Sequence, residues 1–265
     1  MVNNAGRMIK KQTPYFSKSL EKGLRILSLF NQDRISCSQS EISKLTDINM
    51  TSTYRFVNTF VELGYLNKHP ETKKLKLGAK AISLGHGFLR GFDFLQMVKP
   101  IVDEASNQYQ ITIDVALRDA ESLLIIYRRE IRSALPYQLP TVIKNLNSTA
   151  LGKAVLAFLP EQEMHEIIKA LPFEHKTNRT IVDKDQLYRE LEIIKKRGYS
   201  LNNEEFVPGL IALGAPLINT NTDTVAGAIC FDFLSSQTSL SNIKKEYADL
   251  IIHLAKRISQ LLPML

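Results

Sequence analysis

All of the excess basic charge of this chain lies in its first 78 residues. That segment holds 13 Lys and Arg residues against 6 Asp and Glu, whereas residues 79–265 hold 21 of each. A short basic segment joined to a neutral remainder is typical of a module that meets a polyanion, followed by a domain with another task. The charge pattern therefore predicts a nucleic-acid-binding module at the start of the chain.

Length and composition narrow the remaining possibilities. The chain has 265 residues, of which 44% are hydrophobic, and at about 100–200 residues per domain this predicts two domains with cores of their own. Cys37 and Cys230 are far apart and follow no disulfide or zinc-ligand spacing, so we expect neither a metal nor another cofactor. No apolar run reaches the roughly 18 residues that span a bilayer, and residues 1–11 are polar. We therefore expect a cytoplasmic protein with no membrane partner.

The basic segment begins with two predicted helices. In the first, Leu20, Leu24 and Leu27 recur at three- and four-residue steps, which predicts an apolar stripe that faces a core. The second begins at residues 38–41, where Ser-Gln-Ser-Glu has the form of a capping box. It should end at a short turn formed by residues 46–48.

A third helix, capped by Asn49 and running to about Leu63, would present a polar face. On that face and its flanks lie Thr51, Ser52, Tyr54, Arg55 and Asn58. A short helix, a tight turn and a second helix with such side chains near its N-terminus form the helix-turn-helix that reads base edges in the major groove. Taken alone, an ordinary three-helix bundle with a polar surface explains the pattern equally well.

The residues that follow favour DNA binding. Residues 67–77 predict a β-hairpin with Leu75 and Leu77 on one face and lysines on the other. Beside the third helix this hairpin would form a wing, and its Lys73 and Lys74 would reach the phosphate backbone or a minor groove. A bundle without a nucleic-acid partner offers no reason for such a hairpin.

The neutral part of the chain alternates between helical and strand patterns. Residues 80–110 predict a helical linker, interrupted at Gly91 and kinked or restarted at Pro100. Further helices are expected at residues 148–158, 161–171, 183–197 and 240–262, and strands at residues 111–117, 123–127, 210–217 and 225–233. Strands and helices in this order indicate an α+β domain whose helices pack on a sheet.

The last predicted strand carries a face of small residues. Ala226, Ala228, Cys230 and Asp232 alternate with larger apolar residues and so share one side of the strand. Small side chains there leave room for a ligand, although a closely packed helix explains the alanines equally well. Such a helix does not explain Asp232, because a carboxylate on an apolar strand is costly unless it is paired or reached by water at an edge.

Catalytic motifs are missing from the sequence. The five histidines have no partner at the spacing of a metal site or a triad, and neither Gly-x-Ser-x-Gly nor His-Glu-x-x-His occurs. The pair Gly152 and Lys153 is not a phosphate-binding loop, because Asn147 stands where that motif needs its first glycine. The sequence therefore indicates a binding protein and not an enzyme.

A series of short motifs runs through the whole chain. In the basic part they are SLEKGLRIL (19–27), SEI (40–42), STYRF (52–56), ELGYL (62–66) and PET (70–72). In the neutral part they are STALGKAVLA (148–157), RGY (197–199), EEF (204–206), GL (209–210) and AP (215–216). In order and spacing these motifs resemble the IclR-type family of bacterial transcriptional regulators over about residues 17–260. One departure is Asp47, where the family commonly has glycine; we expect the turn to form, because Asp tolerates a left-handed backbone at some cost.

The resemblance implies a fold, partners and a binding site. The fold would be α+β, with a winged helix-turn-helix domain at residues 17–79, a helical linker at 80–110 and a GAF/PAS-like effector-binding domain at 111–265. The partners would be a double-stranded DNA operator, a small-molecule effector and further copies of the chain in a homodimer or homotetramer. The effector pocket would be lined by Ala150, Leu151, Asn202, Ala212, Cys230 and Asp232, several of which differ from the family's usual residue types.

The predicted function is sequence-specific transcriptional regulation, as a repressor in preference to an activator, with operator affinity controlled by a small metabolite. Because a fixed negative charge at Asp232 repels a bare carboxylate, the effector is expected to carry a cationic or multiply hydroxylated group, which Asn202 would help to orient. The alternative is a sensory or enzymatic α+β domain whose basic module binds protein or RNA.

Overall fold

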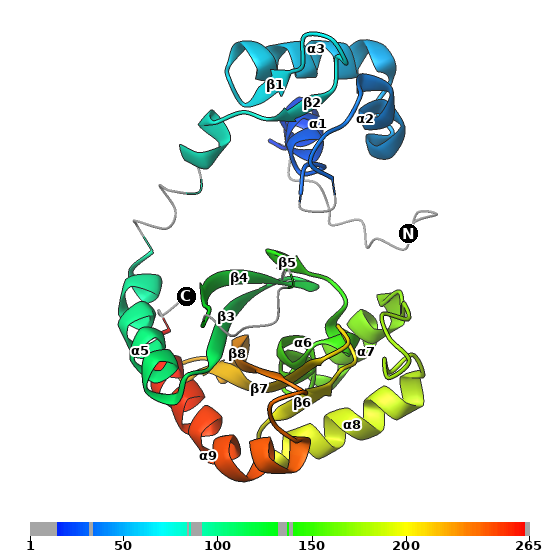
Figure 1. The fold of residues 1–265 in the computed structure, drawn as a ribbon. Coiled ribbons are helices and arrows are strands. Elements are labelled where there is room, and N and C mark those ends of the chain that lie inside the picture. The colour runs from blue at the N-terminus through cyan, green and yellow to red at the C-terminus, as the bar shows by residue number, and fades with distance from the viewer. Residues whose placement is uncertain are drawn as a thin grey trace. The chain divides into compact units, whose positions relative to one another are not determined.

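The chain folds into two compact units, formed by residues 1–92 and 93–265. A computed structural model describes residues 15–31, 34–83, 85, 92–131, 137 and 140–262. Figure 1 traces the helices and strands of each unit in chain order. Among the described residues, no helix is both long and apolar enough to cross a membrane.

Within the described residues, the first unit consists of three helices and a two-stranded hairpin, followed by further helical residues at 80–83 and 85. In chain order these are α1 Lys18–Leu27, α2 Gln39–Thr46, α3 Met50–Glu62, β1 Leu66–Lys68 and β2 Leu75–Leu77. The two strands pair antiparallel. A buried cluster that includes Ile26, Ile42, Val57 and Leu75 joins the helices to the hairpin. The predicted helix-turn-helix with a wing is therefore confirmed as a fold.

Local capping interactions set the ends of α2 and α3. The Ser38 hydroxyl accepts from the Glu41 N–H at 3.3 Å, and a Glu41 carboxylate oxygen accepts from the Ser38 N–H at 2.7 Å, so the predicted capping box is present. Asp47 ends α2 with a left-handed φ of 53°. Asn49 Oδ1 then accepts from the Ser52 N–H at 2.8 Å and starts α3. The turn forms as expected, although glycine adopts this backbone with less strain.

The predicted inward stripe of the first helix is only partly correct, because Leu27 packs against the core but the earlier members of the stripe do not. Leu20 and Leu24 are 63% and 54% exposed, whereas Gly23 and Ile26 are buried. Both sets recur at three- and four-residue steps, so periodicity alone does not choose between them. The absence of a side chain at Gly23 lets the Phe60 ring of α3 approach α1, and this contact decides which face turns inward.

The second unit contains one sheet and its covering helices. In chain order the elements are α5 Asp93–Tyr109, β3 Thr112–Asp119, β4 Ser122–Arg129, β5 Val142–Ile143, the 3-10 helix η1 Leu146–Ser148, α6 Ala150–Leu156, α7 Glu161–Ala170, α8 Lys184–Arg197, β6 Ser200–Asn203, β7 Leu210–Asn219, β8 Thr224–Leu234 and α9 Leu240–Ser259. The sheet has six strands in the order β5-β4-β3-β8-β7-β6, and every neighbouring pair is antiparallel. The predicted α+β class is confirmed.

The helices cover both faces of this sheet (Figure 1). Helices α5 and α9 pack on one face, and α6, backed by α8, packs on the other. Gly214 of β7 allows α6 to lie very close, since a Cβ atom there would be 2.7 Å from the Ala150 carbonyl oxygen. The Ser200 hydroxyl donates to the same oxygen at 2.6 Å. The start of α6 is thus held directly against β6 and β7.

Some elements of the second unit were not predicted, or differ from the prediction. The short strands β5 and β6 are additional, and α5 continues through Pro100 instead of restarting there.

The hairpin of the first unit also differs from the prediction. Leu77 is 42% exposed and does not share the burial of Leu75, because the end of β2 lies beyond the core. Gly91 lies outside the described residues, and the boundaries of the linker stay a prediction.

Candidate functional site

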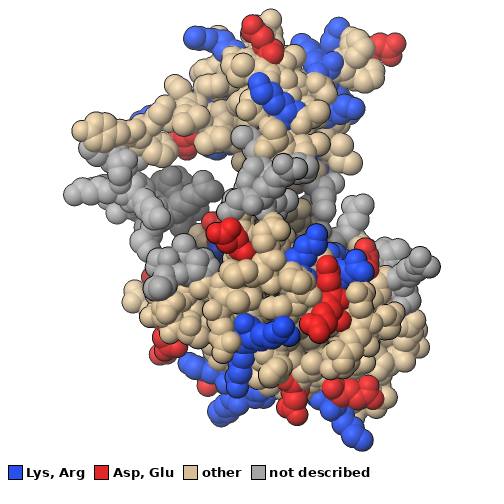
Figure 2. All heavy atoms as spheres, turned by 90° about the vertical axis from the view of Figure 1, so that its left-hand side faces the viewer, with Lys and Arg blue, Asp and Glu red and all other residues tan. Residues whose placement is uncertain are grey.

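Helix α3 presents the predicted DNA-facing side chains at the surface of the first unit. Thr51, Tyr54 and Arg55 are exposed, and Ser52 and Asn58 are half-buried. Thr53 and Val57 on the opposite side are fully buried in the core. Figure 2 shows basic and acidic side chains interspersed on the visible face of both units.

The wing is shaped by a turn that the sequence did not reveal. The His69 ring nitrogen Nδ1 accepts from the backbone N–H groups of Glu71 and Thr72, each at 3.2 Å. Lys73 has a left-handed φ of 56°, and its Nζ donates to the Pro70 carbonyl at 2.6 Å. Lys73 and Lys74 are both exposed at this tip, where they can meet phosphate groups.

In the second unit, all the predicted effector-binding residues line one cavity. This α6 cavity has a volume of about 20 Å³ and is bordered by Tyr137, Ile143, Thr149, Ala150, Leu151, Asn202, Phe206, Leu210, Ala212, Cys230 and Asp232. The side chains come from the start of α6 and from neighbouring strands of the sheet. The sequence did not assign Tyr137, Phe206 or Leu210 to the pocket, although Phe206 and Leu210 belong to the motifs that carry the family resemblance.

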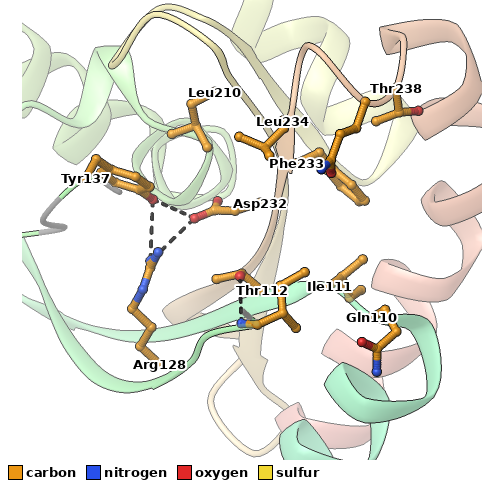
Figure 3. Close-up of a pocket in the computed structure, with 12 residues that line it drawn as sticks. Gln110, Ile111, Thr112, Arg128, Tyr137, Leu210, Asp232, Phe233, Leu234 and Thr238 are labelled. Atoms are coloured by element: carbon orange, nitrogen blue, oxygen red, sulfur yellow. Dashed lines mark hydrogen bonds and ion pairs between the residues drawn. The ribbon is translucent and has the colours of Figure 1, made fainter. Parts of the chain in front are cut away.

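A second cavity adjoins the first at Tyr137, Leu210 and Asp232. This β3 cavity has a volume of about 50 Å³ and is also bordered by Ile111, Thr112, Arg128 and the end of β8. Figure 3 shows Arg128 and Tyr137 converging on the carboxylate of Asp232. The two cavities therefore share a polar cluster that stands between strands β4 and β8.

Asp232 is paired and is not an edge residue open to water. Its side chain is 7% exposed. The Tyr137 hydroxyl donates to Asp232 Oδ2 at 2.5 Å, and Arg128 Nη1 lies 3.4 Å from the same oxygen. These two donors supply the pairing that a carboxylate on an apolar strand requires. The fixed negative charge expected at Asp232 is thus offset by the Arg128 guanidinium.

A second carboxyl group, Asp114 of β3, shares the same arginine. Arg128 Nη1 donates to Asp114 Oδ2 at 2.7 Å, and the side chain of Asp114 is completely buried. Burial first, and the nearby Asp232 second, raise the pKa of Asp114 well above its usual range. Burial likewise raises the pKa of the Cys230 thiol, whose sulfur lies 3.4 Å from Asp232 Oδ1. The cluster therefore sets one arginine against two carboxyl groups, of which Asp114 gives up its proton less readily than an exposed aspartic acid.

The same cluster has the donor types of a metal site. Asp114, Cys230 and Asp232 place one potential ligand atom each within 4.8 Å of one another. The Arg128 guanidinium, however, already provides the positive charge beside both carboxyl groups. The charge that a metal would balance is accordingly balanced by the protein itself.

Asn202 and Phe206 are positioned by a buried ion pair. Lys153 of α6 donates to both carboxylate oxygens of Glu205, at 2.7 and 2.8 Å. Asn202 accepts from the Glu205 N–H at 3.0 Å and donates to the Ser148 carbonyl. Burial raises the pKa of Glu205. Its amide is engaged on both sides, so Asn202 helps to fix the wall of the α6 cavity, and its role in orienting an effector stays a prediction.

Comparison with known proteins places these sites in a family. Residues 19–70 match the IclR helix-turn-helix domain, and residues 86–260 match the bacterial transcriptional regulator IclR C-terminal domain. The second match alone covers more than half of the chain. The chain belongs to the IclR family. This regulator thus binds DNA through its helix-turn-helix and carries an effector-binding C-terminal domain, and its family consists of transcriptional regulators and not of enzymes.

Individual members of the IclR family resemble the chain over most of its length. The regulator XynR of Escherichia coli is 26% identical over 86% of this chain and 92% of its own length. The repressor AllR of Klebsiella pneumoniae is 25% identical over 92% of this chain and 89% of its own. The structure of an IclR homologue from Microbacterium hydrocarbonoxydans, complexed with 4-hydroxybenzoate, has a TM-score of 0.73 at 18% identity and covers 92% of this chain and 98% of that one. The last likeness shows the shared fold.

The proton on Asp114 predicts a characteristic pH dependence. The folded protein retains this proton at pH values where the unfolded chain has lost it, so the free energy of unfolding should fall as pH rises above about 4, by up to about 1.4 kcal/mol per pH unit. Asp114→Asn cannot titrate and should lack this contribution. Urea unfolding of the wild type and the variant between about pH 5 and 7 gives the free energy of unfolding at each pH. The contribution of Asp114 is the difference between the two slopes of this free energy against pH. Parallel slopes would mean that Asp114 is ionised in the folded state.

Proposed function

We propose that this IclR-family regulator is a repressor that recognises a palindromic operator as a homodimer or homotetramer, and that a small molecule in the second unit changes its operator affinity. The observation that supports this most is the convergence of the six effector-binding positions on one cavity. The name of the AllR repressor and the bound 4-hydroxybenzoate of the Microbacterium homologue are consistent with it. Symmetric copies of one recognition helix would read the two halves of a palindrome.

In this proposal the two elements of the first unit have different tasks. The exposed start of α3, with Thr51, Tyr54 and Arg55, enters the major groove and reads base edges. The wing, with Lys73 and Lys74, contacts phosphates and fixes the register without reading sequence. The effector then needs to change operator affinity by only about 1–3 kcal/mol to act as a switch.

Replacement of both wing lysines tests the phosphate contacts. The variant Lys73→Ala/Lys74→Ala should bind all DNA sequences more weakly and should flatten the slope of log affinity against log salt by up to about two units. Fluorescence anisotropy across a salt series measures the slope. The control is Lys195→Ala/Lys196→Ala, which removes the same charge from an exposed part of α8 and should leave the slope unchanged. A wing variant with the wild-type slope would remove the wing from the interface.

Replacement of Arg55 tests base reading. If Arg55 reads a guanine, Arg55→Ala should cost about 1–3 kcal/mol on the operator and much less on random DNA, because only the operator presents the matching base edge. Arg55→Lys keeps the charge but loses the bidentate geometry and should also lose discrimination. Competition binding measures the affinity for an operator fragment selected from genomic DNA and the affinity for random DNA. Equal losses on the two DNAs would reduce Arg55 to a phosphate contact.

The alternative is a sensory domain whose basic unit binds RNA or protein. It would be favoured if duplex RNA competed for the first unit more strongly than duplex DNA of the same length. The same anisotropy assay with unlabelled competitors decides between them.

A further inference from the structure

Building on the proposed function, we infer that the effector is a small neutral compound rich in hydroxyl groups, a polyol of about three to five carbons, whose hydroxyls replace that of Tyr137 on Asp232. This goes further than the sequence, which allowed a cationic effector as well. The pocket supports it by its charge balance, by its hydrogen-bonding groups and by its size.

The charged groups around Asp232 already balance one another. Arg128 Nη1 lies 2.7 Å from Asp114 Oδ2 and 3.4 Å from Asp232 Oδ2. Burial raises the pKa of the Asp114 carboxyl group well above its usual range, which reduces the excess of negative charge over the single guanidinium. A charged ligand would leave an unpaired charge in a buried site, and a neutral ligand would not.

The hydrogen-bonding groups match hydroxyls better than a charged group. Asp232 offers only acceptors, and the Arg128 guanidinium beside it offers only donors. Within the described part of the chain, Arg128 Nη2 has no hydrogen-bond partner, and its ion pair with Glu130 spans 3.6 Å. Hydroxyls donate and accept, so one can donate to Asp232 while a neighbour accepts from Arg128. A carboxylate only accepts and is repelled by Asp232, whereas an ammonium group only donates and is repelled by Arg128.

Tyr137 occupies the place that a ligand hydroxyl would take. Its hydroxyl donates to Asp232 Oδ2 at 2.5 Å. Its ring centroid lies 5.1 Å from the central carbon of the Arg128 guanidinium, and its ring meets Phe206 edge-on at 6.4 Å between centroids. A ligand hydroxyl exchanges one neutral donor for another on Asp232 and leaves the charge balance unchanged. A carboxylate has no proton with which to make this exchange.

The two cavities suit a short chain of such groups. Their volumes are about 20 Å³ for the α6 cavity and about 50 Å³ for the β3 cavity, and Tyr137 and Asp232 border both. Figure 3 shows these two residues in the lining of the β3 cavity. At roughly 10–15 Å³ for each water-sized group, the α6 cavity takes about one hydroxyl and the β3 cavity takes a few. A polyol that passes Asp232 can therefore occupy both.

The test compares three matched sets of compounds on the full-length protein. The first set is glycerol, glycerate and 3-aminopropane-1,2-diol, which differ in charge at one end, and the other two are the four- and five-carbon equivalents. Calorimetry near neutral pH should find at least one polyol that binds about tenfold or more tightly than both charged compounds of its set. An aldonate that binds as tightly as its polyol, or the failure of all nine compounds to bind, would overturn the inference.

Asp232→Asn should reverse this preference. The variant keeps the shape of the side chain but removes a carboxylate that would repel an anion beside Arg128, so the aldonate should now bind about tenfold more tightly than the polyol. Asp103→Asn is the matched control, because Asp103 accepts from the Tyr127 hydroxyl at 2.5 Å and lies 3.7 Å from Arg129 Nε, outside both cavities. It should retain the wild-type order, and an unchanged order in Asp232→Asn contradicts the charge argument.

A second variant keeps the test decisive if Asp232→Asn does not fold. Tyr137→Phe retains the ring but removes the competing hydroxyl, so the polyol should bind several-fold more tightly, and weaker binding would contradict the exchange on Asp232. Operator binding by the same preparations is measured separately. Retained operator binding with no polyol preference refutes only this inference, whereas loss of specific operator binding refutes the proposed function whatever the ligands do.

Discussion

The guanidinium of Arg128, held between two buried carboxyl groups, is the interaction on which the second unit's site depends. It joins β4 to β3 through Asp114 and to β8 through Asp232. Strand register brings these residues together, since Asp114 pairs directly with Arg128 on one side and with Cys230 on the other. A slip of one residue would turn each of these side chains to the opposite face. The cluster therefore specifies the register of the sheet as well as the chemistry of the pocket.

A buried ion pair of this kind is tolerated only when its charges balance. Removing one partner of such a pair typically costs about 3–5 kcal/mol, and the raised pKa of Asp114 reduces the excess negative charge beside Asp232. The Lys153–Glu205 pair follows the same rule at the other end of the α6 cavity, where it fixes the loop that carries Phe206. Arg128 and Lys153 are thus each paired with a carboxyl group, and a ligand that brings an unpaired charge beside them would bind at an energetic cost.

Much of the fold follows from local sequence signals. Three local features could be predicted from the sequence, because each involves residues within a few positions of one another: the capping box at Ser38, the left-handed turn at Asp47 and the cap at Asn49. The alternation of small and large residues correctly predicted the face of β8 that carries Cys230 and Asp232. The sequence could not predict which of two adjacent stripes of α1 is buried, because this depends on a contact between Gly23 and the Phe60 ring, which is far away in sequence.

The candidate site was only partly predictable for the same reason. Six of its lining positions came from a family resemblance, but the partner of Asp232 did not, because Arg128 lies at the end of a strand that alternation predicted only as far as residue 127. The short strand β6 was missed as well, since Ser200–Asn203 is polar and is buried only by contacts with α6 and β7. Interactions between residues far apart in the chain produce no periodic pattern in the sequence, so periodicity does not predict them.

Burial and the nearby Asp232 raise the pKa of Asp114, and we predict from this that Asp114 holds a proton near neutral pH. Infrared difference spectroscopy of wild type against Asp114→Asn near neutral pH tests it most directly, because protonated and ionised carboxyl groups absorb at different frequencies. We predict a carbonyl band of a protonated carboxylic acid in the wild type that shifts in heavy water and is absent from the variant. Loss of carboxylate bands in the variant, with no such carbonyl band in the wild type, would contradict the claim.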